Sequence, residues 1–225
     1  MSYSYYEIYT NAQRAFAGLG FPYGADEDAA YIISWLELFN LNGINLLSKA
    51  YPKLDNAFNG SLTNNKLVDQ IDLQNHSCLM VGPGLVDFMI LNANKNQVIK
   101  IELINCSDPI FLIPLLYRSM EKNIFSKINN DESVLAIISK EKLFIDPKFQ
   151  NNKCSKFSIN FSKKEFEISN SKDFVDYSAI KKNLSLGLNP NEKDWGIVSN
   201  LAFRTYVPES EVSREKGAGG GDAND

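Results

Sequence analysis

Arginine is scarce in this sequence, and two of the arginines lie near the glycine-rich end of the chain, which indicates anion binding. The 225 residues hold 23 lysines and arginines. Only four of these are arginine: Arg14, Arg118, Arg204 and Arg214. The arginine side chain presents a planar fork of donors that matches carboxylate or phosphate oxygens, and glycines let backbone N–H groups converge on one anion. We therefore predict that a small anionic ligand binds to these residues: Arg204, Arg214, Gly217, Gly219, Gly220 and Gly221.

A glycine-rich anion site usually joins a strand to a helix, whereas the glycine-rich run of this chain follows a predicted helix. Three other interpretations of residues 209–225 therefore stay open: a disordered tail, a contact between subunits and a cation site. Small polar residues near a terminus are commonly disordered. The segment is also suited to a contact between subunits. Finally, Asp222, Asn224 and Asp225 supply hard oxygen ligands of the kind that Mg²⁺ or Ca²⁺ prefers.

Asp87 is the candidate acid or base. It stands in the otherwise apolar run Leu85–Leu91, which predicts a strand. A partly buried carboxylate has a raised pKa and is suited to proton transfer. Glu102, on a later predicted strand, would approach it in some strand registers. The alternative is a solvated carboxylate on the open face of an antiparallel sheet.

His76 and Cys78 form a second candidate pair. They are two residues apart, so on a strand their side chains share one face. An imidazole beside a thiol is a known nucleophile arrangement. The alternative is a polar residue at the edge of a strand. Because His76 is the one histidine in the chain, multi-histidine metal sites are excluded, and apart from the open interpretation of residues 209–225 we predict no metal site.

The end of the sequence resembles a known signature. Its motifs are an Arg-Thr-Tyr-x-Pro segment at 204–208, a Ser-Arg pair at 213–214, and a Gly-Ala-Gly-x-Gly run at 217–221 followed by acidic and amide residues. These motifs resemble the C-terminal signature of an uncharacterised bacterial domain-of-unknown-function family. The segments 82–87 and 108–114 are similar more loosely. The resemblance implies a single domain, and it implies no activity because the family is uncharacterised.

Helical and strand patterns occupy different parts of the chain. Apolar residues recur at helical spacing over residues 1–52, and the polar stretch 53–76 predicts a surface connection. A buried helix is expected from Asp108 to Lys122, and helix resumes over 173–207. Short apolar or alternating runs predict strands at 77–81, 85–91, 97–104, 133–139, 157–161 and 166–168.

This order predicts an α+β fold. We expect a mostly antiparallel or mixed sheet of five to six strands, covered by the N- and C-terminal helices. The length and the absence of a boundary signal predict one domain over 1–225, with a helical N-terminal part at 1–52 and a glycine-rich tail at 209–225.

The composition narrows the class of protein. A net charge of −4 disfavours nucleic acid as a partner, and the longest nearly apolar run, Pro109–Tyr117, is too short to span a membrane. The first residues lack the features of a secretion signal. The odd number of cysteines (Cys78, Cys106 and Cys154) is typical of a reduced protein, so we expect a cytoplasmic location.

Two functions follow from these patterns. The first is a cytoplasmic enzyme, or a catalytic accessory, that acts on a small anionic metabolite. The alternative is a non-catalytic interaction or regulatory subunit, favoured by the scarcity of nucleophile and base constellations. The glycine-rich run is neither a nucleotide-binding P-loop nor a dinucleotide fingerprint, so the cofactor is left unassigned. Homo-oligomers and association with a partner subunit both stay open.

Overall fold

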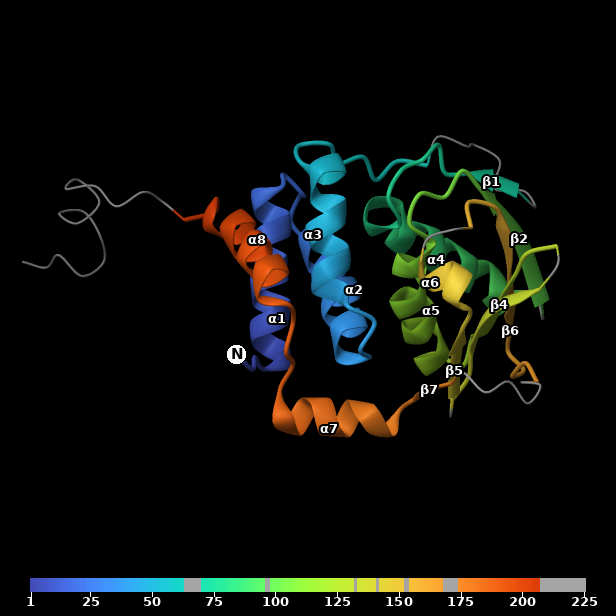
Figure 1. Cartoon of the computed structure of the whole chain (residues 1–225). Helices are drawn as coiled ribbons and strands as arrows, with labels where there is room; N and C mark the ends of the chain where they lie inside the picture. The colour runs from blue at the N-terminus through green and yellow to red at the C-terminus, as the bar shows by residue number, and fades with distance from the viewer. Residues whose placement is uncertain are drawn as a thin grey trace, which may run out of the picture.

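The chain folds into three layers: a sheet, a pair of helices on one of its faces, and a helical bundle beyond them (Figure 1). The computed structural model describes residues 1–62, 70–95, 98–131, 133–140, 142–151, 154–167 and 174–206. The predicted α+β class is confirmed.

The bundle begins with three N-terminal helices, in the part of the chain where the sequence predicts them. They are α1 (Tyr5–Gly18), α2 (Ala25–Leu38) and α3 (Gly43–Leu54). Ser4 starts α1 with a capping box, since its side chain accepts from the Glu7 N–H while the Glu7 carboxylate accepts from the Ser4 N–H. The C-terminal helix α8 (Glu192–Phe203) packs against α1 and α3 and completes the bundle.

The sheet is mixed and, among the described residues, has seven strands, slightly more than predicted. Its spatial order is β1-β2-β6-β3-β4-β5-β7. Only β1 and β2 are parallel; every other neighbouring pair is antiparallel. The bounds are β1 Gln70–Asp72, β2 Val98–Ile104, β3 Phe125–Asn129, β4 Val134–Ile138, β5 Lys142–Ile145, β6 Phe157–Ser162 and β7 Phe174–Asp176.

The segment around Asp87 is a helix, which corrects the prediction of strands at 77–81 and 85–91. Helix α4 spans Cys78–Lys95 and runs through Gly82-Pro83-Gly84, a sequence typical of a turn. A Cβ at Gly82 would lie 3.0 Å from Leu115 Cδ1, so α4 and α5 pack closely at this glycine. The buried positions of the segment, among them Leu85, Val86, Met89 and Ile90, follow the helical period and not the period of a strand.

Helices α4 and α5 (Leu112–Glu121) cover one face of the sheet, and the terminal helices pack on them through α2. The turn η1 (Pro109–Phe111) leads into α5, so the buried helix predicted from Asp108 is confirmed. Helix α5 is buried along most of its length because it lies between two layers, and its last turn, with Arg118 and Glu121, reaches the surface. The N- and C-terminal helices therefore do not cover the sheet directly, because α4 and α5 lie between them and the sheet.

The remaining elements join the layers. Helix α6 (Pro147–Gln150) lies near η1, and α7 (Ser178–Leu186) bridges the sheet and the bundle (Figure 1). The strand predicted at 157–161 is confirmed as β6, which pairs with β2 and β3. In the segment predicted as a strand at 166–168, Phe166 is not in a strand. Within the described ranges, no helix combines the length and apolarity needed to cross a bilayer.

Candidate functional site

A cavity of about 180 Å³ lies where the parallel strands β1 and β2 end. In the order β1, α4, β2, the helix connects the two parallel strands, so the loops that follow them meet at one edge of the sheet. The Asn75 N–H donates to the Asn105 carbonyl (2.9 Å) and joins these loops. Open sheets commonly bind ligands outside the carboxyl ends of parallel strands. The His76 cavity, as we call it, is lined by Ala50, Lys53, Leu54, Ala57, Asn75, His76, Ser77, Met80, Ser107 and Asp108.

Asp108 is the buried acid of the His76 cavity, with 9% of its surface exposed. The Ser77 hydroxyl donates to Asp108 Oδ2 (2.5 Å), and the Cys78 N–H donates to Oδ1 (2.7 Å). Burial raises the pKa of Asp108, although the hydrogen bonds from Ser77 and Cys78 oppose that shift. A carboxylate at the first N–H groups of α4 also suits the positive end of the helix dipole. Asp108 thus fixes the start of α4 and the loop before it.

At the cavity, the His76 ring lies beside the Asn59 side-chain amide. His76 Nε2 lies 3.3 Å from Asn59 Nδ2. The Asn59 amide is oriented by Ser61, whose N–H donates to Asn59 Oδ1 (3.0 Å), so Asn59 Nδ2 donates and His76 Nε2 accepts. In the neutral ring the proton is therefore on Nδ1. Lys53, at the end of α3, brings a positive charge to the same cavity.

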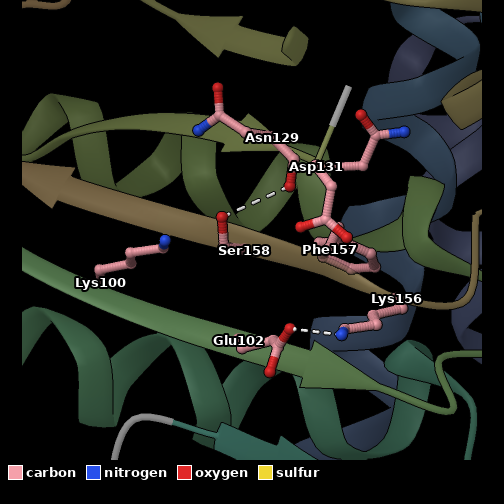
Figure 2. A pocket seen from close by; sticks show the side chains of 8 residues that line it. Lys100, Glu102, Asn129, Asp131, Lys156, Phe157 and Ser158 are labelled. Carbon is pink, nitrogen blue, oxygen red and sulfur yellow. Dashed lines mark hydrogen bonds and ion pairs between the residues drawn. The ribbon is translucent and has the colours of Figure 1, made fainter. Parts of the chain in front are cut away.

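A larger hollow of about 380 Å³ lies on the face of the sheet opposite α4 and α5 (Figure 2). Two of its charged groups are paired: Lys156 Nζ lies 3.0 Å from Glu102 Oε1, and the bonds from Lys156 and Gln70 lower the pKa of Glu102. Lys100 and Asp131 line the hollow as well. Because this lining carries two lysines and two acids, it offers no net charge to an anion.

A third hollow, of about 310 Å³, lies between α2, α3 and α8 and is acidic. Glu37 and Asp194 line it with asparagines and bring no cation. Burial raises the pKa of Glu37, whose carboxylate accepts from the Ile44 N–H (2.9 Å). Of these three hollows, the His76 cavity alone combines a histidine, a lysine and a buried carboxyl group.

The predicted site residues do not meet within the described structure. Arg204 follows α8 and pairs with Asp55 at the end of α3 (2.8 Å), on the bundle. Asp87 lies exposed on α4, in the middle layer, on a helix where we expected a strand. Arg214, Gly217, Gly219, Gly220 and Gly221 lie outside the described residues.

The sequence pointed to His76 and Asp108 separately, but not to their common cavity. The sequence places His76 beside Cys78 on a predicted strand, and it places Asp108 at the start of the helix predicted over 108–122. The structure uses the Asp108 side chain at α4 instead. The available signal was a polar sequence shortly after each of the two strands, at 74–77 and 105–108. Using that signal requires β1 to be recognised as a strand.

The Arg204 pair gives a test of bidentate binding. A single nitrogen, Arg204 Nη1, contacts both Asp55 oxygens (2.8 and 2.9 Å), a geometry that an ammonium group can imitate. Because the pair is partly exposed, we expect Arg204→Lys to change the free energy of unfolding by less than about 0.5 kcal/mol in urea titrations. A loss above about 1 kcal/mol would show that the guanidinium has a further partner.

The comparisons with known proteins begin with a family of unknown function. Residues 3–79 match the family model described as "Protein of unknown function (DUF3726)". This match confirms, over those residues, the resemblance to a domain-of-unknown-function family. The matched range includes the three N-terminal helices, β1, His76 and Ser77. It does not reach the C-terminal signature. No curated protein matches the sequence.

Two solved structures share the fold. One is a proposed malate/lactate dehydrogenase from E. coli, with a TM-score of 0.58 and 6% identity, covering 93% of this chain and 96% of the other. The second is the sulfolactate dehydrogenase of Methanocaldococcus jannaschii, with a TM-score of 0.56 and 8% identity, covering 89% and 96%. At such identities the likeness is one of fold.

Proposed function

We propose that this chain is an enzyme, or a catalytic accessory of one, that acts on a small anionic metabolite in the His76 cavity. The observation that supports it most is the arrangement of His76, Ser77 and Asp108 where β1 and β2 end. The two structural neighbours are named for malate, lactate and sulfolactate, which are small anions. Their names agree with the ligand class that the residues indicate.

The side chains have distinct roles in this proposal. Lys53 attracts the negative group of the ligand, since its ammonium is the positive charge of the cavity lining. His76 Nδ1 exchanges a proton with a ligand oxygen, because Nε2 is engaged by Asn59. Asp108 is a positioning residue: it bonds to Ser77 and Cys78 and so holds the loop that carries His76.

The cavity does not fit a dinucleotide. Its volume of about 180 Å³ is below the range of roughly 300–1,000 Å³ typical of pockets for drug-sized ligands, and a dinucleotide is larger than most drugs. No hydride-transfer step is therefore assigned to these residues. The proposed chemistry is limited to binding a small anion and moving a proton at His76.

A thermal-shift experiment tests the proposal. The purified chain is heated with lactate, malate, sulfolactate, acetate or phosphate. A ligand at 100 times its Kd adds about 2.7 kcal/mol to the stability of the folded state and so raises Tm. We expect at least one anion to raise Tm for the wild type, and His76→Gln and Lys53→Met to remove the rise.

Lys100→Met is the matched control, because it removes one lysine from the larger hollow and leaves the His76 cavity intact. It should retain the rise in Tm. A rise that is lost in Lys100→Met and kept in Lys53→Met would place the ligand in the larger hollow and contradict our assignment. The absence of any rise would count against anion binding.

A contribution from the C-terminal tail remains part of the proposal. Arg204, Arg214, Gly217 and Gly219 to Gly221 would supply further donors to the anion, and Asp87 would act as a second acid or base. Deleting residues 209–225 separates this idea from the His76 cavity. If the tail binds ligand, the deletion weakens the Tm response; if the cavity suffices, the response is unchanged.

A non-catalytic subunit is the second candidate. Helix α7 exposes Leu184 and Leu186, with 57% and 66% of their surfaces accessible, and none of its residues is buried. Exposed leucines on a helix favour contact with another protein surface. Light scattering of the purified chain tests this: an oligomer that dissociates in Leu184→Lys, together with no anion response, would favour the subunit.

A further inference from the structure

The three cysteines of the chain occupy one region of the fold, although they are far apart in the sequence. Cys78 is the first residue of α4, Cys106 lies in the loop after β2, and Cys154 precedes β6. The Cys106 N–H donates to the Ser155 carbonyl (3.0 Å), which brings the loop of Cys106 against the residue next to Cys154. No metal-binding group of three acids, histidines or cysteines occurs in the described ranges.

Two of these thiols touch. Cys78 Sγ and Cys106 Sγ are 3.3 Å apart, and their side chains are 0% and 3% exposed. A disulfide has a sulfur–sulfur distance of about 2.05 Å, so closing this pair needs an approach of little more than about 1 Å. Cys154 is half-buried, and its thiol donates to the Lys156 carbonyl.

We propose that Cys78 and Cys106 are an oxidative modification site that forms a disulfide across the wall of the His76 cavity. Cys78 directly follows Ser77 and Cys106 directly precedes Ser107, two residues that line the cavity, so the bond joins the two loops that carry them. Formation of the bond needs only the thiol contact; its effect on a ligand rests on the proposed function.

A peroxide is the oxidant class that suits such an enclosed pair, because hydrogen peroxide is nearly as small as water. The Cys106 sulfur, which retains a little exposed surface, attacks one peroxide oxygen and the O–O bond breaks. The departing hydroxide takes the Cys106 thiol proton and leaves as water, so that Cys106 becomes a sulfenic acid. The Cys78 sulfur then attacks the Cys106 sulfur. The new S–S bond displaces the hydroxyl, which leaves as a second water with the Cys78 proton. Two thiols are oxidised and one peroxide is reduced to two waters.

The disulfide is expected to hold the cavity loops in their present arrangement. It ties the first residue of α4 to the loop after β2, two segments already joined by the bond from the Cys78 N–H to Asp108. A cross-link restricts the unfolded chain and so raises Tm when the folded geometry accepts it. The oxidised chain should therefore melt at a higher temperature than the reduced chain.

The experiment uses the full chain treated with hydrogen peroxide. Free thiols are then alkylated in denaturant, and the peptides are mapped by mass spectrometry without reduction. We expect a cross-linked pair of peptides carrying Cys78 and Cys106 in the wild type and in Cys154→Ser, with a rise in Tm that a reductant reverses. Cys106→Ser should show neither the cross-linked peptides nor the rise in Tm after peroxide treatment. Its melting curve before treatment shows whether this variant is folded.

Two results would overturn the proposal. One is complete alkylation of Cys78 and Cys106 after peroxide treatment, with oxidation confined to Cys154. The other is a cross-link that contains Cys154. Because the peptide map needs no ligand, these results bear on the thiol pair alone. Failure of the anion screen with a Cys78–Cys106 cross-link present would instead count against the proposed function only.

Discussion

Gly43→Ala should destabilise the chain by about 3 kcal/mol, the largest effect that we expect from a single methyl group. A Cβ at position 43 would lie 2.0 Å from the Ile33 carbonyl oxygen and 2.9 Å from the Glu37 nitrogen, both backbone atoms of α2. Backbone atoms within a helix cannot move aside as a flexible side chain does. The helices α2 and α3 would have to separate, and the bond between the Ile44 N–H and the Glu37 carboxylate would break.

Gly196→Ala is the matched control for this effect. Gly196 lies within α8, and a Cβ there would meet no atom within 4 Å. Alanine has the higher helix propensity, so the control should gain about 0.5–1 kcal/mol. Urea unfolding followed by circular dichroism measures both variants. Equal stabilities of Gly43→Ala and the wild type would contradict the close approach of α2 and α3.

Asp108→Ala should cost about 2–3 kcal/mol, the second-largest effect. The substitution leaves the Ser77 hydroxyl and the Cys78 N–H without their acceptor in a buried place. Asp108→Asn keeps an oxygen that accepts from the Cys78 N–H and should recover most of the loss. Chemical denaturation at a single pH measures the free energy of unfolding, which should decrease from the wild type to Asp108→Asn and further to Asp108→Ala.

The pH dependence of these variants has a defined sign. Because burial raises the folded-state pKa of Asp108 above its unfolded value, the folded state holds the proton more tightly. The contribution of this proton to the free energy of unfolding is therefore fully present below the pKa of Asp108 in the unfolded chain. It is lost as the pH rises through the pKa of Asp108 in the folded chain. Asp108→Asn has no such group, so its stability relative to the wild type should improve as the pH rises across that window. A difference in stability between Asp108→Asn and the wild type that does not change with pH would contradict the raised pKa of Asp108.

The sequence predicts the helical layers well because their signals are local. In α1, the residues Ile8, Ala12, Ala15 and Phe16 are buried at the spacing that the sequence displays. The strand β2 is similarly clear, since Ile101 and Leu103 are buried while Lys100 is exposed. In each case one element carries its own periodicity, and the burial pattern follows from it.

The error over α4 and the missed cavity have a common origin in tertiary contacts. Gly82 and Pro83 are local signals for a turn, yet packing of α4 against α5 and the sheet outweighs them. Strand β1 has only three residues, and parallel pairing with β2 defines it. That pairing brings His76 and Asp108 together from 32 positions apart in the numbering (108 − 76), which no spacing rule specifies.

The most direct test of the proposed anion site is proton NMR of its imidazole. The chain has one histidine, so the ring protons of His76 give one set of signals that need no assignment by mutation. The proposal predicts that lactate, malate or sulfolactate shifts these signals to saturation at constant pH, and that Lys53→Met abolishes the shift while Lys100→Met retains it. If the folded chain binds one of these anions and the His76 signals stay in place, the anion lies elsewhere and the assignment of the His76 cavity is contradicted.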